Sequence, residues 1–241
     1  MSKIPAISTA QMVEVDRLMI EEFGIGLKQM MENAGLNLAS LARDRFLSGD
    51  ARGKVVVVLA GSGGNGGGGL VAARRLHNWG AHVLVFVSRP AENFCGVPGD
   101  QLAILHNLEI EIIEPGNLSE FPAADLIIDA LIGYSLSGAP HGSAAHLIKQ
   151  ANAQSTPILS LDTPSGVDTT SGSAYQPHIK AAATLTLALP KIGLFAPPAQ
   201  PAVGDLFLAD IGVPPELYAR LGLQVRPIFA QATIIPIAYE A

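Results

Sequence analysis

The sequence predicts an α/β protein built around a mostly parallel β-sheet. Short apolar runs rich in valine, isoleucine and leucine alternate along the chain with amphipathic stretches. Such runs are typical of parallel strands, because helices on both sides of the sheet bury both faces of each strand. A glycine-rich segment also joins the first apolar run directly to a helix-like stretch. Together these observations predict a doubly wound, Rossmann-like three-layer αβα sandwich.

The alternating pattern gives the order of the elements. We predict strands near residues 54–60, 81–87, 109–113, 125–130, 157–161 and 182–189, and helices near 69–79, 99–107 and 142–153. A short apolar run at 233–237 can add an edge strand or cover one, and Pro236 argues against a central position for it. We expect one domain that spans residues 1–241.

Two further helices precede the first predicted strand. Ser8 or Thr9 can cap the first helix, in which apolar residues recur at helical spacing. The second helix follows Gly26 and carries its own apolar stripe. We expect both helices to form an N-terminal extension of the sheet.

Composition and charge exclude several classes of function. The net charge of −6 and the lack of a block of lysine and arginine argue against a general nucleic-acid surface. A single cysteine, Cys95, excludes a disulfide framework and favours a cytoplasmic protein. The six histidines lack the spacing of a zinc site. No segment approaches the ~20 apolar residues that a membrane span needs, so we expect a soluble protein with a small-molecule ligand.

The glycine-rich segment, residues 61–69, is the strongest sign of a ligand site. It reads Gly-Ser-Gly-Gly-Asn-Gly-Gly-Gly-Gly between the strand at 54–60 and the helix-like stretch at 70–77. Backbone N–H groups at the start of a helix attract anions, and glycine lets a phosphate approach them closely. We therefore expect a phosphate-bearing ligand at this segment.

A weaker interpretation of the same segment is an NADP-dependent reductase. Residues 61–66 fit the GxGxxG pattern, which many phosphate-binding proteins share. The second predicted strand ends at Ser88 and Arg89, which suit a 2′-phosphate better than a free ribose. This hypothesis lacks a second, substrate-binding domain. A tight turn without any ligand is a further alternative.

Two other predicted strands end in carboxylates. Asp129 closes the strand at 125–130, and Asp162 follows the strand at 157–161 just before Ser165. Asn65, Asp129 and Ser165 bring oxygen ligands from three neighbouring strand ends, which suits a hard monovalent cation. Asp162 is then free for acid/base chemistry or for substrate binding. Each aspartate can instead be a cap of the turn that follows it.

Several motifs in a fixed order resemble the YjeF N-terminal domain, the NAD(P)H-hydrate epimerase family. The resemblance runs from about Ile7 to Pro214, and its combination of motifs is far more specific than any one of them. The motifs are Met31-Glu-Asn-Ala-Gly35, the glycine-rich segment with Leu70-Val-Ala-Ala-Arg74, Asp129-Ala-Leu-Ile-Gly133, Leu161-Asp-Thr-Pro-Ser-Gly166, Pro190-Lys-Ile-Gly-Leu194 and Ala209-Asp-Ile-Gly-Val-Pro214.

The resemblance implies a function and a set of partners. The family interconverts the R and S epimers of hydrated NADH and NADPH in the repair of damaged nicotinamide nucleotides, so the chain is expected to be an isomerase. It implies a Rossmann-like fold, a homodimer and a potassium ion beside the substrate. A functional link to an ATP- or ADP-dependent NAD(P)H-hydrate dehydratase is also implied, which we expect on a separate polypeptide.

Residue by residue, the resemblance implies a complete site. The potassium ligands fall on Asn65, Asp129 and Ser165, and Asp162 is the expected catalytic residue. The substrate-binding residues implied by the family are Gly64, Asn65, Gly66, Gly67, Gly68, Gly133, Tyr134, Ser135, Leu136, Ser137, Gly138, Ala139 and Asp162.

The chain departs from the family pattern in the glycine-rich segment. Ser62, Gly64 and Gly68 stand where proline, asparagine and aspartate are usual, and Ser137 stands where some members have a basic residue. Backbone contacts to a phosphate survive these changes, whereas two polar side chains are lost. The alternative function is therefore a catalytically impaired nucleotide-binding or interaction module on the same fold.

Overall fold

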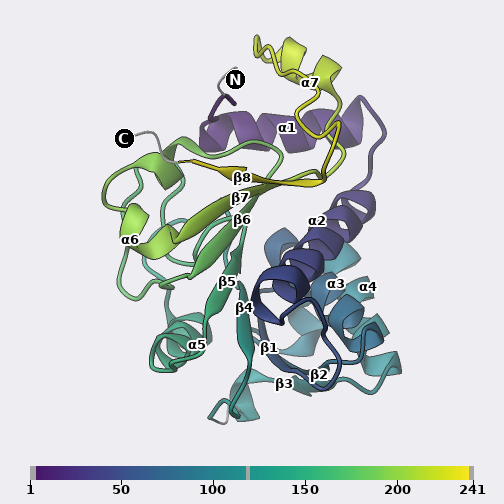
Figure 1. Ribbon diagram of the computed structural model, residues 1–241, viewed down its shortest axis with the longest axis vertical. Helices are drawn as coiled ribbons and strands as arrows, with labels where there is room; N and C mark the ends of the chain where they lie inside the picture. The colour runs from purple at the N-terminus through teal and green to yellow at the C-terminus, as the bar shows by residue number, and fades with distance from the viewer. Residues whose placement is uncertain (1–3, 118–119, 239–241) are drawn as a thin grey trace.

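A central β-sheet organises the computed structural model, which describes residues 4–117 and 120–238 (Figure 1). Within these residues the sheet has eight strands in the order β3-β2-β1-β4-β5-β6-β7-β8, and only the last pair, β7 with β8, is antiparallel. The strands are β1 (Val55–Ala60), β2 (His82–Val87), β3 (Glu111–Ile113), β4 (Leu126–Ala130), β5 (Ile158–Leu161), β6 (Ala183–Leu187), β7 (Asp205–Ala209) and β8 (Ile234–Ile237). The predicted α/β fold with a mostly parallel sheet is confirmed.

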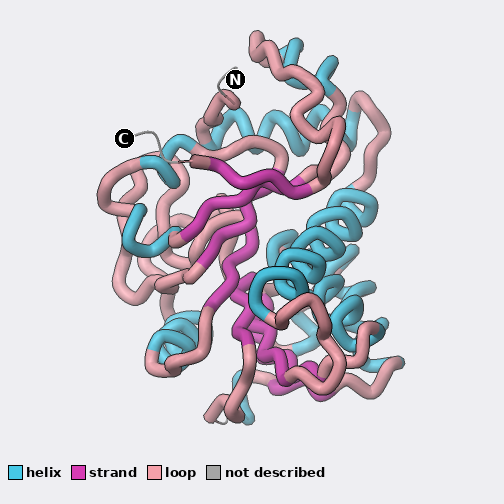
Figure 2. The backbone as a smooth tube through the Cα atoms, viewed as in Figure 1, coloured by secondary structure: helices cyan, strands magenta, loops and turns pink. Residues whose placement is uncertain are grey.

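Helices cover both faces of the sheet. Figure 2 shows the strands enclosed between one group of helices on the right and a smaller group on the left. Helices α2, α3 and α4 form the first layer, and α5 lies on the opposite side (Figure 1). No helix of the described residues is both long and apolar enough to cross a bilayer. The helices are α1 (Thr9–Glu21), α2 (Leu27–Leu41), α3 (Gly64–Asn78), α4 (Gly96–Asn107), α5 (Gly142–Asn152), α6 (Gln200–Val203) and α7 (Pro215–Arg220).

The residues of β1 explain why this strand lies in the middle of the sheet. Val56 and Val58 are buried in the core beneath α2, α3 and α4, whereas Val57 and Leu59 are buried in the core on the other face. Successive side chains of a strand point to opposite faces, so a run of apolar residues buries both. The predicted edge strand at 233–237 is β8, and Pro236 lies within it, opposite Phe207 of β7.

The two N-terminal helices have different roles. Ser8 is the N-cap of α1, because its side chain accepts a hydrogen bond from the backbone N–H of Gln11 while its own N–H donates to the Gln11 side chain. Helix α1 packs against α7 near the carboxyl ends of the strands, as an extension would. Helix α2, in contrast, belongs to the main helical layer and packs against α3. The expectation that both helices form an extension is therefore wrong for α2.

Helix α3 begins at Gly64, earlier than the expected start near residue 69. The first turns of this helix are nearly all glycine, a poor helix former, so tertiary packing determines their conformation. A Cβ atom at Gly67 would lie 2.6 Å from Met31 Sδ, and one at Gly69 would lie 2.5 Å from Ala130 Cβ. Glycine is required here because α2 and β4 approach the helix backbone closely.

The contact between α2 and α3 gives the first prediction. A Cβ at Gly35 would lie 2.4 Å from Val71 Cβ and 2.7 Å from the Gly68 carbonyl oxygen, so Gly35→Ala should lower the free energy of unfolding by about 1–3 kcal/mol. Gly64→Ala is the matched control, since its Cβ would meet only Met31 Cε at 3.9 Å. Urea denaturation of both variants measures the difference. Equal stability of the two variants would contradict the close packing.

Candidate active site

A cavity lies at the carboxyl ends of β1, β4 and β5. Helix α3 follows β1 on one side of the sheet and α5 follows β4 on the other, and the order in which successive strands join the sheet reverses between these two parallel neighbours. Ligands of open α/β sheets bind at such a point, beyond the ends of the strands. The cavity volume of about 640 Å³ is in the range of small-molecule sites.

Most of the predicted substrate-binding residues line this cavity. The wall contains Gly64, Asn65, Gly68, Gly133, Tyr134, Ser135, Leu136, Ser137, Gly138, Ala139 and Asp162. Gly66 and Gly67 lie behind this wall, packed against neighbouring backbone and Met31. A Cβ at Gly66 would lie only 1.6 Å from the Gly61 carbonyl oxygen. A side chain at Gly66 would therefore disrupt the turn between β1 and α3, and would not act on a ligand alone.

Asp162 is held by a buried lysine. It follows β5 with a positive φ of 65°, a backbone conformation that aspartate tolerates better than most residues. Its Oδ1 accepts a hydrogen bond from Lys191 Nζ, and its Oδ2 accepts one from the backbone N–H of Tyr134 at 3.1 Å. Both charged side chains are buried, and the ion pair holds Asp162 in position at the cavity wall.

Lys191 is fully buried and has no free hydrogen-bond donor. Besides Asp162, its ammonium group donates to the Leu187 carbonyl oxygen at 2.8 Å and to Thr186 Oγ1 at 3.3 Å. The sequence prediction did not give this lysine a role, although it lies in the motif at 190–194. The sequence offered one signal, a lone lysine directly after the apolar strand at 182–189. A lysine buried at such a position needs a partner of opposite charge, because lysine is rarely buried unpaired.

Asp129 and Ser165 form a second buried group behind the cavity wall. The Asp129 carboxylate accepts hydrogen bonds from Ser165 Oγ at 2.6 Å, the Ser165 N–H at 2.9 Å and Ser160 Oγ at 2.8 Å. Burial raises the pKa of Asp129, and these bonds oppose that effect. All of these donors are neutral, and no ion pair to Asp129 occurs within the described residues. A bound cation would therefore stabilise its charge.

Asn65 is the third of the expected cation ligands. It lies at the start of α3, and a Cβ on Gly133 would lie 3.2 Å from its Cγ. Its Nδ2 atom is buried without a hydrogen-bond partner. Because a half-turn of the amide would exchange its nitrogen and oxygen, Asn65 can present an oxygen at this position. The orphaned amide and the uncompensated Asp129 carboxylate thus fit a hard monovalent cation.

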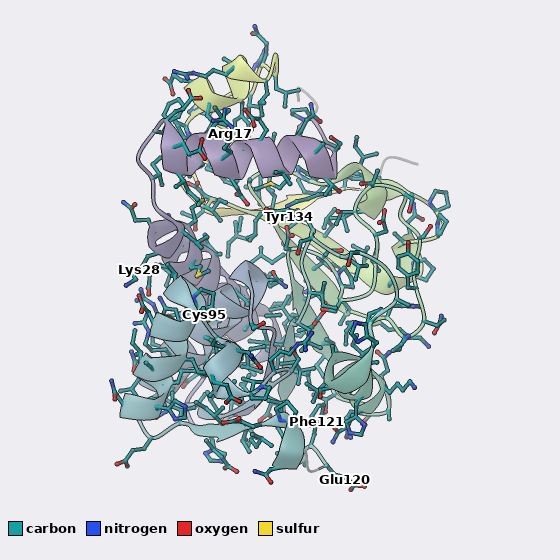
Figure 3. The ribbon with its side chains drawn as sticks, turned by 180° about the vertical axis from the view of Figure 1, so that it is seen from behind. Arg17, Lys28, Cys95, Glu120, Phe121 and Tyr134 are labelled. Atoms are coloured by element: carbon teal, nitrogen blue, oxygen red, sulfur yellow. The ribbon has the colours of Figure 1, made fainter. Side chains whose placement is uncertain are left out.

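Two further cavity residues, Asp16 and Arg89, carry charged side chains and are absent from the predicted set of site residues. Asp16 of α1 lines the cavity, and its Oδ2 accepts a hydrogen bond from the Tyr134 hydroxyl. Figure 3 shows Tyr134 beside α1, between that helix and the sheet. Arg89, at the carboxyl end of β2, is exposed and also lines the cavity, where it could contact a phosphate. The spacing of apolar residues in α1 gave no signal for Asp16.

The Asp162–Lys191 pair generates the second prediction. Lys191→Met leaves the Asp162 carboxylate buried without its cation, so the free energy of unfolding should fall by about 3–5 kcal/mol. The double variant Asp162→Asn, Lys191→Met removes both charges and should recover much of this loss. Urea denaturation of the two variants and the parent is the measurement. If the double variant is no more stable than Lys191→Met, the buried charge is not the cause.

Comparison with known proteins identifies the family. The family model described as "YjeF-related protein N-terminus" matches residues 27–193. The chain is 45% identical over 225 residues to an NAD(P)H-hydrate epimerase from Dehalogenimonas lykanthroporepellens, covering 92% of this chain and 87% of the relative. It is 34% identical to a bifunctional NAD(P)H-hydrate repair enzyme Nnr from Moorella thermoacetica, covering 88% of this chain and 41% of that protein.

The fold agrees with these relatives. The crystal structure of yeast ynu0, YNL200c, superposes with a TM-score of 0.79 at 25% identity, covering 97% of this chain and all of that one. The resemblance inferred from the motifs is thereby confirmed, and the chain belongs to the YjeF-related N-terminal family.

Proposed function

We propose that this chain is an NAD(P)H-hydrate epimerase, an isomerase that interconverts the R and S epimers of hydrated NADH and NADPH. The proposal rests on the buried, ion-paired Asp162 in the cavity wall. It also rests on the 45% identity of the chain to a protein named as an NAD(P)H-hydrate epimerase. Repair of damaged nicotinamide nucleotides is the corresponding metabolic role. The catalytic role of Asp162 and the substrate contacts are part of this proposal.

The geometry of the cavity supports a dinucleotide substrate. Backbone N–H groups at the start of α3 favour an anionic group, and the glycines there leave room for a phosphate. The segment 133–139 forms the facing wall and would contact the hydrated ring or its ribose. Arg89 at the end of β2 lies where the adenosine ribose is held in related dinucleotide sites.

In this proposal Asp162 moves a proton during the reaction. The hydrated ring carbon can lose its hydroxyl as water and regain water on its opposite face, which inverts that carbon. Asp162 would accept or donate the proton in these steps, and its hydrogen bonds to Lys191 and Tyr134 fix its orientation. Such preorganisation lowers the cost of reaching the transition state.

A potassium ion fits the group formed by Asn65, Asp129 and Ser165. Asp129 would supply the negative charge, and Ser165 and Asn65 would supply neutral oxygens. A bound cation would neutralise the buried carboxylate and join the ends of β1, β4 and β5. The three residues thereby support the cavity wall without taking part in proton transfer.

The family suggests two kinds of partner. Some relatives are bifunctional repair enzymes, so we infer a functional link to a dehydratase that uses one epimer of the hydrate. A homodimer is also expected from the family resemblance. Both expectations concern assembly and metabolism, and neither alters the site described above.

The departures in the glycine-rich segment bear on the alternative of an impaired binding module. At Gly64 there is room for a side chain, whereas a Cβ at Gly68 would lie 2.8 Å from Leu161 Cδ2. An aspartate at residue 68 thus requires Leu161 to move. The retained Asp162–Lys191 pair favours an active enzyme over a module that only binds nucleotides.

The third prediction tests the function directly. The purified protein should convert the R epimer of hydrated NADH into the S epimer faster than the spontaneous reaction, as followed by chromatography. Asp162→Asn keeps the shape of the side chain and should lower kcat by ~10²–10⁴, with little change in KM. Conversion at the spontaneous rate by the parent protein would refute the enzyme and favour the binding module.

The fourth prediction concerns potassium. Addition of potassium chloride should raise the melting temperature of the parent more than an equal concentration of choline chloride does, because a cation stabilises the buried Asp129 carboxylate. Asp129→Asn should remove this difference. A melting temperature of the parent that responds equally to both salts would contradict the metal assignment.

A further inference from the structure

Two carboxyl groups border the cavity at opposite ends of one tyrosine. The backbone N–H of Tyr134 donates to Asp162 Oδ2, and the Tyr134 hydroxyl donates to Asp16 Oδ2. Both aspartates line the cavity. The two carboxyl groups therefore bind opposite ends of the same residue.

The environments of the two carboxyl groups differ. Asp162 forms an ion pair with Lys191, whereas Asp16 forms no ion pair within the described residues. Burial raises the pKa of Asp16, and the hydrogen bond from Tyr134 lowers it. The negative charge of Asp162 raises this pKa further, whereas the positive charge of Lys191 lowers it. A pair of carboxyl groups in contrasting environments is a common basis for dividing acid and base roles.

The proposed reaction needs proton transfer on two faces of one carbon. Water leaves from one face of the hydrated ring and returns to the other. A single aspartate would have to reach both faces, whereas inverting glycosidases place one carboxyl group on each side of the reacting carbon. Asp162 and Asp16, bound at the two ends of Tyr134, can act on opposite faces of the carbon in the same way.

We propose that Asp16 is the second acid/base residue of the epimerisation and acts on the ring face opposite to Asp162, with Tyr134 as its positioning residue. This inference rests on the proposed function. Asp16 lies in α1, outside the residues 27–193 that the family model matches. Helix α1 therefore supplies part of the reactive site as well as part of the fold.

The proton and electron movements balance without a further reactant. In one direction, Asp16 as the acid gives its proton to the ring hydroxyl, the C–O bond breaks and water leaves, while the lone pair of the adjacent ring nitrogen forms a C=N bond. A second water adds its oxygen to that carbon from the opposite face, its proton passes to the Asp162 carboxylate, and the C=N pair returns to nitrogen. Proton exchange with solvent water then returns Asp16 to the acid form and Asp162 to the carboxylate, and the two aspartates exchange roles in the reverse direction.

The test uses the full chain and hydrated NADPH in water enriched in oxygen-18. The parent should incorporate one labelled oxygen per epimerisation. Asp16→Asn retains an acceptor for the Tyr134 hydroxyl and should lower kcat by ~10²–10⁴ with KM little changed. Tyr134→Phe should lower kcat less, again at constant KM. Glu14→Gln is the matched control on the exposed side of α1 and should keep the parental kcat.

A second variant separates catalysis from folding. Asp16→Ala removes the carboxyl group. Added formate should restore part of the epimerase activity of this variant and leave the activity of the parent unchanged. A purely structural role of Asp16 would not allow such rescue. Parental kcat in Asp16→Asn, or an inactive Asp16→Ala that formate does not rescue, would overturn the role of Asp16 while the epimerase function stands. Absence of epimerisation by the parent would instead refute the proposed function itself.

Discussion

The structure depends on how closely the start of α3 approaches its neighbours. Gly67, Gly68 and Gly69 contact Met31 of α2, Leu161 of β5 and Ala130 of β4, at distances that no larger residue could share without movement. This contact joins the helical layer to the ends of two strands, β4 and β5. It also leaves the first N–H groups of α3 beside the cavity. Backbone packing and the proposed anion site therefore depend on the same glycines.

A chain of buried polar contacts links the other parts of the site. Lys191 joins Asp162 to the end of β6, and Tyr134 joins Asp162 to α1. Lys191 and Asp162 are removed from water as an ion pair, which limits the cost of burying their charges. Elements that are distant in the sequence are held together by these contacts, so the shape of the cavity depends on residues from both halves of the chain.

Much of the fold could be predicted because the spacing of apolar residues along the chain indicates which faces of helices and strands are buried. The strands β1 to β6, the capping of α1 by Ser8 and the edge position of β8 each follow from local patterns. Strand β7 (Asp205–Ala209) was not predicted from the sequence. The early start of α3 could not, because glycine disfavours helix and only tertiary contacts explain its conformation. In the site, strand ends identified Asp129 and Asp162. The partners Lys191 and Asp16 were missed, since their positions depend on how distant segments pack.

The glycine-rich segment divides into two parts with different freedom to evolve. At Gly63 a Cβ would meet nothing within 4 Å, and at Gly64 it would only touch Met31, although both residues line the cavity. From Gly66 to Gly69 every added Cβ would collide with the neighbouring structure. Changes at residues 63 and 64 can therefore alter ligand preference while the fold is kept. Relatives can thus differ in substrate choice through these two residues alone.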